Sequence, residues 1–237
     1  MIYLISGANR GLGLELVREG ARLGVEIIAA CRNRGKELPA LAGAYPDLIR
    51  IVTMDVADTQ SVEAAFKETA EKYRYLNGFI NNAGLLYGSK FDTRDPLTSI
   101  DIDEAAATFN TNVLGPIRVM KYFMPLVYAA PEERCIVNIS SDGALIRPGG
   151  HVYASYSASK SALNCYTQRM RNYLASRPDK ADIRVYLIHP GKMRTDMGKE
   201  LGEIEASEAA AGIWDIIIRR KDLKAPVPFY DYKGALI

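Results

Sequence analysis

Short, almost uninterrupted apolar runs alternate with longer helix-like stretches along the whole sequence. Unbroken apolar runs are typical of parallel strands that helices cover on both faces. A repeated strand–helix order therefore predicts a doubly wound α/β sheet of about seven strands. The expected strands are Met1–Ser6, Val25–Cys31, Leu48–Met54, Leu76–Asn81, Arg134–Ser140, Ile183–Ile188 and Val227–Tyr230. The expected helices are Gly13–Leu23, Ser61–Tyr73, Asp103–Tyr128, Tyr156–Ser176 and Ser207–Arg220.

Length and charge limit the number of domains and the kinds of partner. No linker or repeat divides the 237 residues, so we expect one domain over residues 1–237. Thirty Lys plus Arg against 28 Asp plus Glu give a net charge of +2, too balanced for a nucleic-acid-binding surface. No apolar run reaches the ~20 residues of a membrane span, and no signal peptide precedes the first strand. We therefore expect no nucleic acid or membrane partner and a cytoplasmic location.

Cysteines and histidines are few and scattered. The cysteines are Cys31, Cys135 and Cys165. No CxxC pair or Cys/His cluster accompanies them, so they are expected to be small core residues in a reducing compartment. His151 and His189 are isolated, and we expect no metal site. The simplest role for His189 is packing before the turn at Pro190.

A glycine-rich turn follows the first expected strand and opens a helix. It reads Ser6-Gly7-Ala8-Asn9-Arg10-Gly11-Leu12-Gly13. Its glycines let the backbone approach a pyrophosphate, which the N–H groups and dipole of a helix N-terminus attract. The spacing is GxxxGxG rather than the common GxGxxG, so it matches a dinucleotide fingerprint loosely. A plain strand-to-helix connection is the alternative interpretation.

The charges near this turn favour NADP(H) over NAD(H). The second expected strand ends Ala29-Ala30-Cys31-Arg32, without the carboxylate that binds the ribose of NAD. Arg10 lies within the glycine turn itself. Two guanidinium groups can hold a 2′-phosphate by charge-assisted hydrogen bonds. The alternative is that either arginine is only a solvated surface charge.

Tyr156 and Lys160 stand four residues apart near the start of an expected helix, so their side chains share one face. Chance would produce roughly 0.7 such Tyr-xxx-Lys pairs in this chain, so the pair alone is weak evidence. A phenol is a useful acid if its pKa falls from about 10 toward 7, which corresponds to ~4 kcal/mol. An ammonium ~4 Å away supplies an interaction of that order. Lys160 is therefore expected to lower the pKa of Tyr156.

Over essentially its whole length the chain resembles the short-chain dehydrogenase/reductase family, because five motifs stand in the family's order. They are the Ser6 to Gly13 turn, Asn81-Asn82-Ala83-Gly84, Asn112-Val113-Leu114-Gly115, Ser141 before Tyr156-xxx-Lys160, and Pro190-Gly191-xxx-Thr195. The resemblance implies a single Rossmann-type domain that binds a nicotinamide dinucleotide. Asn112 to Pro116 and Phe229 to Gly234 further resemble the Sniffer and C-factor branch.

The resemblance also implies the catalytic roles. Tyr156 would be the general acid and base, and Lys160 would hold the nicotinamide ribose. Ser141 would hydrogen-bond the substrate oxygen as charge develops on it, and Asn112 would hold a water that links Lys160 to solvent. Ser140 stays an alternative to Ser141, because the gap from serine to tyrosine is about two residues longer than the family's, which implies a small insertion near residues 149–155.

The remaining expected contacts form the cofactor site and the pocket. The cofactor residues are Gly7, Asn9, Arg10, Gly11, Leu12, Gly13, Arg32, Asp55, Val56, Asn82, Ala83, Gly84, Tyr156, Lys160, Pro190, Gly191, Met193 and Thr195. A short substrate lid around residues 193–206 implies an open pocket. Its walls are expected to include Leu85, Tyr87, Leu145, Tyr153 and Met197.

The function that this resemblance implies is an NADP(H)-dependent interconversion of a carbonyl compound and an alcohol. The partner would be a small-molecule aldehyde, ketone or alcohol, in a homodimer or homotetramer. Two alternatives remain at this point. One is a signalling or interaction protein like C-factor, and the other is a dinucleotide-binding regulator without chemistry. A further alternative, an epimerase or dehydratase of the extended branch, is disfavoured by the GxxxGxG spacing and the short C-terminal part.

Overall fold

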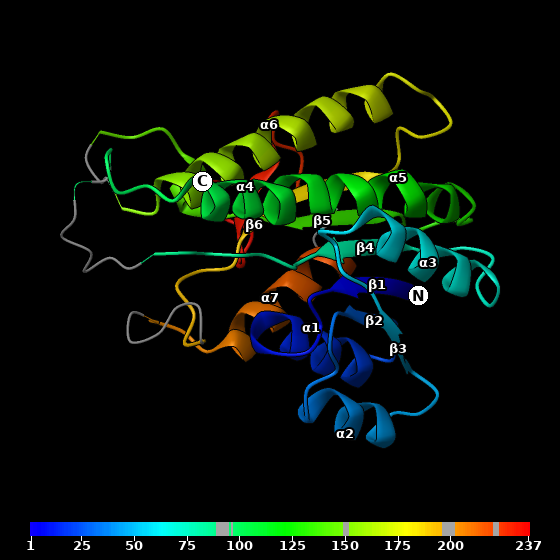
Figure 1. Cartoon of the computed structure of the whole chain (residues 1–237). Coiled ribbons are helices and arrows are strands. Elements are labelled where there is room, and N and C mark those ends of the chain that lie inside the picture. The colour runs from blue at the N-terminus through cyan, green and yellow to red at the C-terminus, as the bar shows by residue number, and fades with distance from the viewer. Residues whose placement is uncertain (89–94, 96, 149–151, 196–201, 220–222) are drawn as a thin grey trace.

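A single parallel sheet forms the centre of the molecule (Figure 1). The computed structural model describes residues 1–88, 95, 97–148, 152–195, 202–219 and 223–237. Within these ranges seven strands pair in the order β3-β2-β1-β4-β5-β6-β7, each parallel to its neighbours. The strands are β1 (Ile2–Ser6), β2 (Glu26–Cys31), β3 (Ile49–Thr53), β4 (Gly78–Asn81), β5 (Cys135–Ile139), β6 (Arg184–His189) and β7 (Phe229–Asp231). The predicted doubly wound fold is confirmed.

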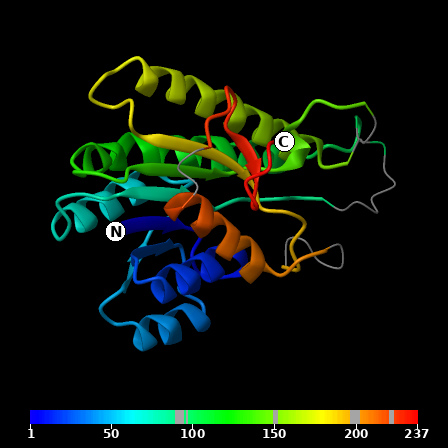
Figure 2. The same ribbon diagram turned by 180° about the vertical axis from the view of Figure 1, so that it is seen from behind.

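Helices cover both faces of the sheet. They are α1 (Gly11–Arg22), α2 (Glu37–Ala44), α3 (Thr59–Ala70), α4 (Ile102–Phe109), α5 (Gly115–Tyr128), α6 (Ala154–Ala175) and α7 (Ala206–Ile218). Helices α1 and α7 lie on one face, and α3, α5 and α6 lie on the other (Figure 1). Figure 2 shows the same two layers from behind, with β7 beside β6 at one edge of the sheet.

Alternate strand residues build two separate cores, because successive side chains of a strand point to opposite faces. Tyr3 packs edge-on against Trp214 of α7, with ring centroids 5.3 Å apart. The Trp214 indole N–H donates to the Leu16 carbonyl at 2.8 Å, which joins α7 to α1. The next residue of β1, Leu4, belongs to the core on the opposite face, together with Phe123 of α5. Both cores therefore contain side chains of β1, the strand that leads into the glycine turn.

Three predicted features differ in the structure. The expected helix Asp103–Tyr128 is divided into α4, a π-helical turn η1 (Asn110–Leu114) and α5. Pro116 explains a break at this place, because proline cannot donate to the carbonyl four residues earlier and its ring clashes with it. Helix α2 was not predicted, because its sequence ELPALAGA has no helical apolar period. Cys165 is exposed rather than buried, whereas Cys31 and Cys135 are core residues as expected.

The strand order reverses between β1 and β4, which lie side by side although β2 and β3 come between them in sequence. In doubly wound sheets, the carboxyl ends of the strands at such a reversal form the ligand crevice. The fold therefore directs the ends of β1, β4, β5 and β6 to one edge. In the described part of the chain, none of the helices has the length and apolar character of a membrane span.

Candidate active site

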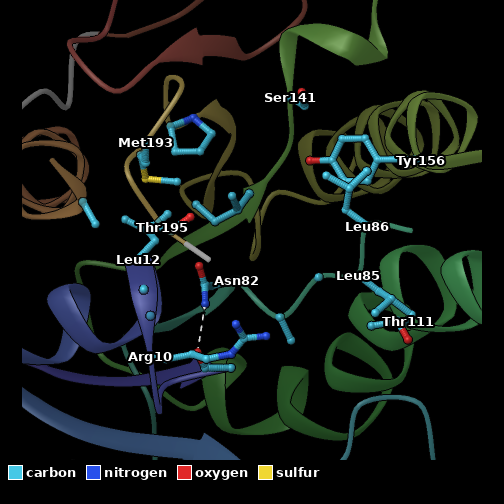
Figure 3. Close-up of a pocket in the computed structure, with 18 of the residues that line it drawn as sticks. Arg10, Leu12, Asn82, Leu85, Leu86, Thr111, Ser141, Tyr156, Met193 and Thr195 are labelled. Carbon is cyan, nitrogen blue, oxygen red and sulfur yellow. Dashed lines mark hydrogen bonds between the residues drawn. The ribbon is translucent and has the colours of Figure 1, made fainter. Parts of the chain in front are cut away.

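A cleft of about 1550 Å³ opens at the carboxyl ends of these strands. The glycine turn, the ends of β4 and β5, the start of α6 and the segment after β6 all line it (Figure 3). Every predicted cofactor residue and three of the four predicted catalytic residues border this cleft. Those three are Ser141, Tyr156 and Lys160, while Asn112 lies behind the wall. The structure thus brings together residues spread over most of the chain.

The glycine turn has the shape that a pyrophosphate requires. Gly7 and Gly11 have φ of +66° and +53°, which side chains disfavour. A Cβ on Gly13 would stand 2.0 Å from the Gly7 carbonyl oxygen, so this contact needs glycine. Arg10 is the N-cap residue of α1, and its side chain makes no capping hydrogen bond, which leaves the first N–H groups of α1 for an anion. The turn therefore fits a dinucleotide.

The end of β4 holds the glycine turn in place. The Asn82 side-chain amide donates to the carbonyl oxygens of Ser6 and Gly7, at 3.0 and 3.2 Å. The Ser6 hydroxyl accepts from the main-chain N–H groups of Asn82 and Ala83, both at 3.1 Å. Ser6 was not predicted to have a role beyond the motif. Its function is clear only from the strand order, which places β4 beside β1.

Arg32 and Asp55 lie together at the far end of the cleft. Arg32 is 74% exposed, and its Nη1 lies 3.8 Å from Asp55 Oδ2. An exposed ion pair of this kind is worth about 1 kcal/mol or less, so Arg32 is able to turn toward another anion. Asp55 also accepts a hydrogen bond from the Ala57 N–H at 2.9 Å. Asp55 therefore shapes its own turn as well as bordering the site.

Asn112 is fully buried in the π-helical turn. Its Oδ1 accepts from the Leu85 N–H at 2.7 Å, and its Nδ2 donates to the Leu85 carbonyl and the Ser159 hydroxyl. Asn112 thus joins the chain after β4 to α6. A Cβ placed on Gly84 would have Asn112 Oδ1 at 3.6 Å and Lys160 Nζ at 3.7 Å, so both atoms flank Gly84. The water-holding role of Asn112 stays a prediction.

Lys160 is 4% exposed and points toward the end of β5. Its Nζ donates to the Ile139 carbonyl at 2.8 Å and lies 5.7 Å from the centre of the Tyr156 ring. Burial lowers the pKa of Lys160 to about 8, because a low-dielectric environment disfavours the ammonium. The two residues share one face of α6, as the spacing predicted.

The pKa of Tyr156 is shifted in the direction opposite to our expectation. Burial raises it, and the nearby Asp142 carboxylate raises it further, while a hydrogen bond with Ser141 lowers it. The expected lowering by Lys160 is not among these effects. The reason is that the pKa of Lys160, about 8, lies below the raised pKa of Tyr156, so the lysine is already neutral when the phenol loses its proton. In Figure 3 the Tyr156 hydroxyl points into the cleft, toward the side where Met193 and Thr195 lie.

The geometry favours Ser141 over Ser140. The Ser140 hydroxyl donates to Asn164 Oδ1 at 2.6 Å and is held against α6. The Ser141 hydroxyl accepts from the Gly143 N–H at 3.1 Å and donates to Asp142 Oδ1 at 3.2 Å. Ser141 is also the serine whose side chain lowers the pKa of Tyr156. These bonds belong to a short 3₁₀ turn, η2 (Asp142–Ala144), which follows β5.

The segment after β6 folds back over the glycine turn. Gly191 has φ of +82°, and a Cβ there would meet Ile204 Cδ1 at 2.7 Å. Met193 pairs with Ile204 in an isolated bridge. Thr195 lies next to Gly11, whose Cβ position is 3.6 Å from Thr195 Cγ2. The centre of the predicted lid, residues 196–201, lies outside the described residues, so the lid stays a prediction.

Sequence reasoning missed polar side chains in the cleft, His189 among them, and misplaced part of the apolar wall. His189 lines the cleft, and its Nδ1 accepts from the Asp142 N–H at 3.2 Å. Its isolation in sequence carried no signal of this contact. Leu85, Tyr87 and Tyr153 line the cleft as expected, but Leu145 does not. Met197 lies outside the described residues.

The family described as short chain dehydrogenase matches residues 1–206. A solved structure, the carbonyl reductase Sniffer of Drosophila melanogaster, aligns with a TM-score of 0.87 and 30% identity, covering 99% of this chain and 98% of that one. The NADPH-bound carbonyl reductase from chicken fatty liver aligns with a TM-score of 0.85 and 27% identity, covering 99% and 97%. An L-xylulose reductase of Caenorhabditis elegans is 30% identical over 83% of this chain and 73% of its own length.

Proposed function

The chain belongs to the short-chain dehydrogenase family, and on that premise we propose that it is an NADP(H)-dependent reductase of aldehydes or ketones, reversible as an alcohol dehydrogenase. The observation that carries this proposal is the position of the Tyr156 phenol. It borders the cleft together with Ser141, and the glycine turn forms the other end of that cleft. A carbonyl held between these two ends meets both a proton donor and a dinucleotide site.

The chain has residues to hold the cofactor along the whole cleft. The glycine turn and the N-terminus of α1 receive the pyrophosphate, and Lys160 holds the nicotinamide ribose. The turn at Pro190 and Gly191 borders the nicotinamide end. When bound, a reduced nicotinamide supplies the hydride that adds to the carbonyl carbon.

Tyr156 supplies the proton that balances the hydride. Because burial raises the pKa of Tyr156, the phenol keeps its proton at neutral pH. The substrate oxygen accepts a hydrogen bond from Ser141 and takes the Tyr156 proton as its C–O double bond becomes single. The product is an alcohol, and solvent returns a proton to the phenolate.

The preference for NADP(H) rests on charge at the adenosine end of the cleft. Arg10 and Arg32 both border the cleft, and β2 ends in Cys31 without an adjacent carboxylate that would bind a ribose hydroxyl. The chicken carbonyl reductase, with NADPH bound, supports the same choice. We further propose a cytoplasmic enzyme that associates as a homodimer or homotetramer. Exposed Tyr166 and Tyr173 on α6 and Leu114 before α5 support that association.

The test is NADPH oxidation by the purified chain with a panel of aldehydes, ketones and quinones, compared with Tyr156→Phe. We expect wild-type turnover of at least one carbonyl and a loss of about 10²–10⁴-fold in the variant, since the phenylalanine ring cannot donate a proton. NADPH binding, followed by fluorescence, should be retained. Equal turnover by both proteins, or none by the wild type, contradicts the proposal and leaves a signalling or regulatory role.

A further inference from the structure

His189 ends β6 at the point where it meets the turn that carries Ser141. The ladder between β5 and β6 pairs Ile139 with Ile188, and the Ser140 N–H then donates to the Ile188 carbonyl at 2.7 Å. This pairing continues beyond β5 and sets His189 beside Asp142. On the other side, β7 places Asp231 opposite His189. His189 therefore lies in the strand between β5 and β7, next to η2.

The hydrogen bond between His189 and the turn determines which ring nitrogen carries the proton. The Asp142 main-chain N–H donates to His189 Nδ1 at 3.2 Å. A peptide N–H is always a donor, so Nδ1 must offer a lone pair. The ring is then neutral, and its proton is on Nε2.

The same turn fixes the Ser141 hydroxyl. That hydroxyl has hydrogen bonds with the N–H of Gly143 and the carboxylate of Asp142, and Ser141 lowers the pKa of Tyr156. The Asp142 N–H belongs to the middle residue of this turn, between Ser141 and Gly143. By holding it, His189 fixes the middle of the turn and hence the distance between the serine and tyrosine hydroxyls.

We propose that His189 is the positioning residue of Ser141: its neutral imidazole holds the turn by accepting the Asp142 main-chain hydrogen bond, and protonation of the ring releases the turn and halts catalysis. This inference rests on the proposed reductase function. His189 itself gives no proton to the substrate.

Protonation places two donors face to face. A proton on Nδ1 would oppose the Asp142 N–H across 3.2 Å, so that hydrogen bond is lost. The Asp142 carboxylate, 3.9 Å from Nδ1, is an acceptor within reach of the protonated ring. Pairing with the imidazolium draws that carboxylate away from Ser141. The serine then loses its partner and its position relative to Tyr156.

The charges around His189 determine the pH at which this happens. Burial lowers the pKa of His189 below its ordinary value of 6.5, and Lys192 acts in the same direction. Asp142 and Asp231 oppose this effect by favouring the imidazolium. The net lowering keeps the ring neutral above pH 6.5. The turn is therefore released only as the pH falls below that value.

Two variants separate the hydrogen bond from the titration. His189→Asn keeps an oxygen acceptor near the position of Nδ1 but cannot gain a proton. His189→Leu has similar bulk and no acceptor. kcat and KM are measured from pH 4.5 to 8 with NADPH and a carbonyl that the wild type reduces. We expect the wild-type kcat to fall on the acid side with one pKa below 6.5, His189→Asn to lose this acid limb, and His189→Leu to lose about tenfold in kcat throughout, with little change in KM for NADPH.

Asp142→Asn is the matched control for the neighbouring carboxylate. It keeps the main-chain N–H but removes the charge that favours the imidazolium. We expect the acid limb to remain and to move to lower pH. An acid limb that persists in His189→Asn overturns the inference. So does an acid limb that disappears in Asp142→Asn, because Asp142 would then be the titrating group.

A readout without turnover distinguishes this inference from the proposed function. The chain has two histidines, so ¹⁵N–¹H correlation spectra of the wild type and His189→Asn assign the His189 ring. At pH 7 we expect the neutral Nε2–H tautomer, and a spectrum with the proton on Nδ1 overturns the inference whatever the activity. A wild type that reduces no carbonyl overturns the proposed function and the catalytic part of this inference, while the tautomer still decides whether the hydrogen bond exists.

Discussion

Arg32 is a single residue at which the preference for NADP(H) can be tested. Its guanidinium is exposed and only loosely paired with Asp55, so it is available to a 2′-phosphate. We predict that Arg32→Ala weakens NADPH binding about 10–100-fold, the range for losing a charge-assisted hydrogen-bonded pair. NADH binding should change little, because NADH has no phosphate at that position. Fluorescence titration measures both, and tighter NADH than NADPH binding by the wild type, unaffected by Arg32→Ala, contradicts the preference.

Lys160 makes the stability of the protein depend on pH in a predictable direction. The pKa of Lys160 is about 8 in the folded protein, below the value of about 10.4 in an unfolded chain. Between these values the unfolded chain binds more protons, so the free energy of unfolding rises with pH. We predict that from pH 7 to 10 the wild type gains about 2 kcal/mol relative to Lys160→Met. Urea unfolding of both proteins at each pH measures this difference, since other groups cancel, and a constant difference contradicts the shift.

Residue types and order along the chain were enough to predict most of the site. All the predicted cofactor residues border one cleft, because parallel strands bring their ends to a common edge. The direction of the Tyr156 pKa was not predictable, since it depends on burial and on the nearby Asp142 carboxylate. His189 was missed for a similar reason: its partner, Asp142, is 47 residues away and meets it only through the register of β5 and β6.

At the scale of elements, buried amides attach α6 to the sheet. Asn138 of β5 accepts from Asn81 Nδ2 at 2.7 Å and donates to Thr167 of α6 at 2.8 Å. Thr167 follows Lys160 by two turns of the helix, so this network fixes the height of the catalytic end of α6. An unpaired buried polar group is costly, and Asn81 Oδ1 already has no partner within the described residues.

We predict that Asn138→Ala lowers the free energy of unfolding by about 2–3 kcal/mol, because it leaves the Asn81 amide without its acceptor and the Thr167 oxygen without its donor. Asn172→Ala is the control: it removes an exposed hydrogen bond with Gln168 on the same helix, so the change should stay within about 0.5 kcal/mol. Chemical denaturation measures both. Equal losses in the two variants would show that the buried network does not hold α6.

The strands and helices were predicted correctly where the apolar pattern was the main signal. Apolar runs located all seven strands to within two residues of their ends in the described structure. The division of the long helix at Asn110 was not visible in its apolar period, which continues from α4 into α5. Helix α2 was missed because its helicity comes from packing Leu38 and Leu41 under the edge of the sheet. Local signals predicted the layers, while tertiary contacts determined these two details.

At the scale of the whole molecule, we propose that one cleft holds both the nicotinamide that donates the hydride and the Tyr156 phenol that donates the proton. The sheet places the glycine turn at the end of β1 and the Ser141 turn at the end of β5, with β4 between them. In the described residues this one sheet and its helices border the whole cleft. Because we expect the pocket to be open, we also expect it to admit several carbonyl compounds.

Transfer of deuterium from NADPH to the alcohol tests this proposal. NADPH deuterated on one face of the nicotinamide C4, and in a second sample on the other face, is incubated with the protein and a carbonyl that it reduces. Mass spectrometry of the alcohol then locates the label. We predict one deuterium on the carbinol carbon from one of the two samples, with Tyr156→Phe forming about 10²–10⁴-fold less labelled alcohol. An alcohol without label from either sample, or equal labelling by the variant, would contradict it.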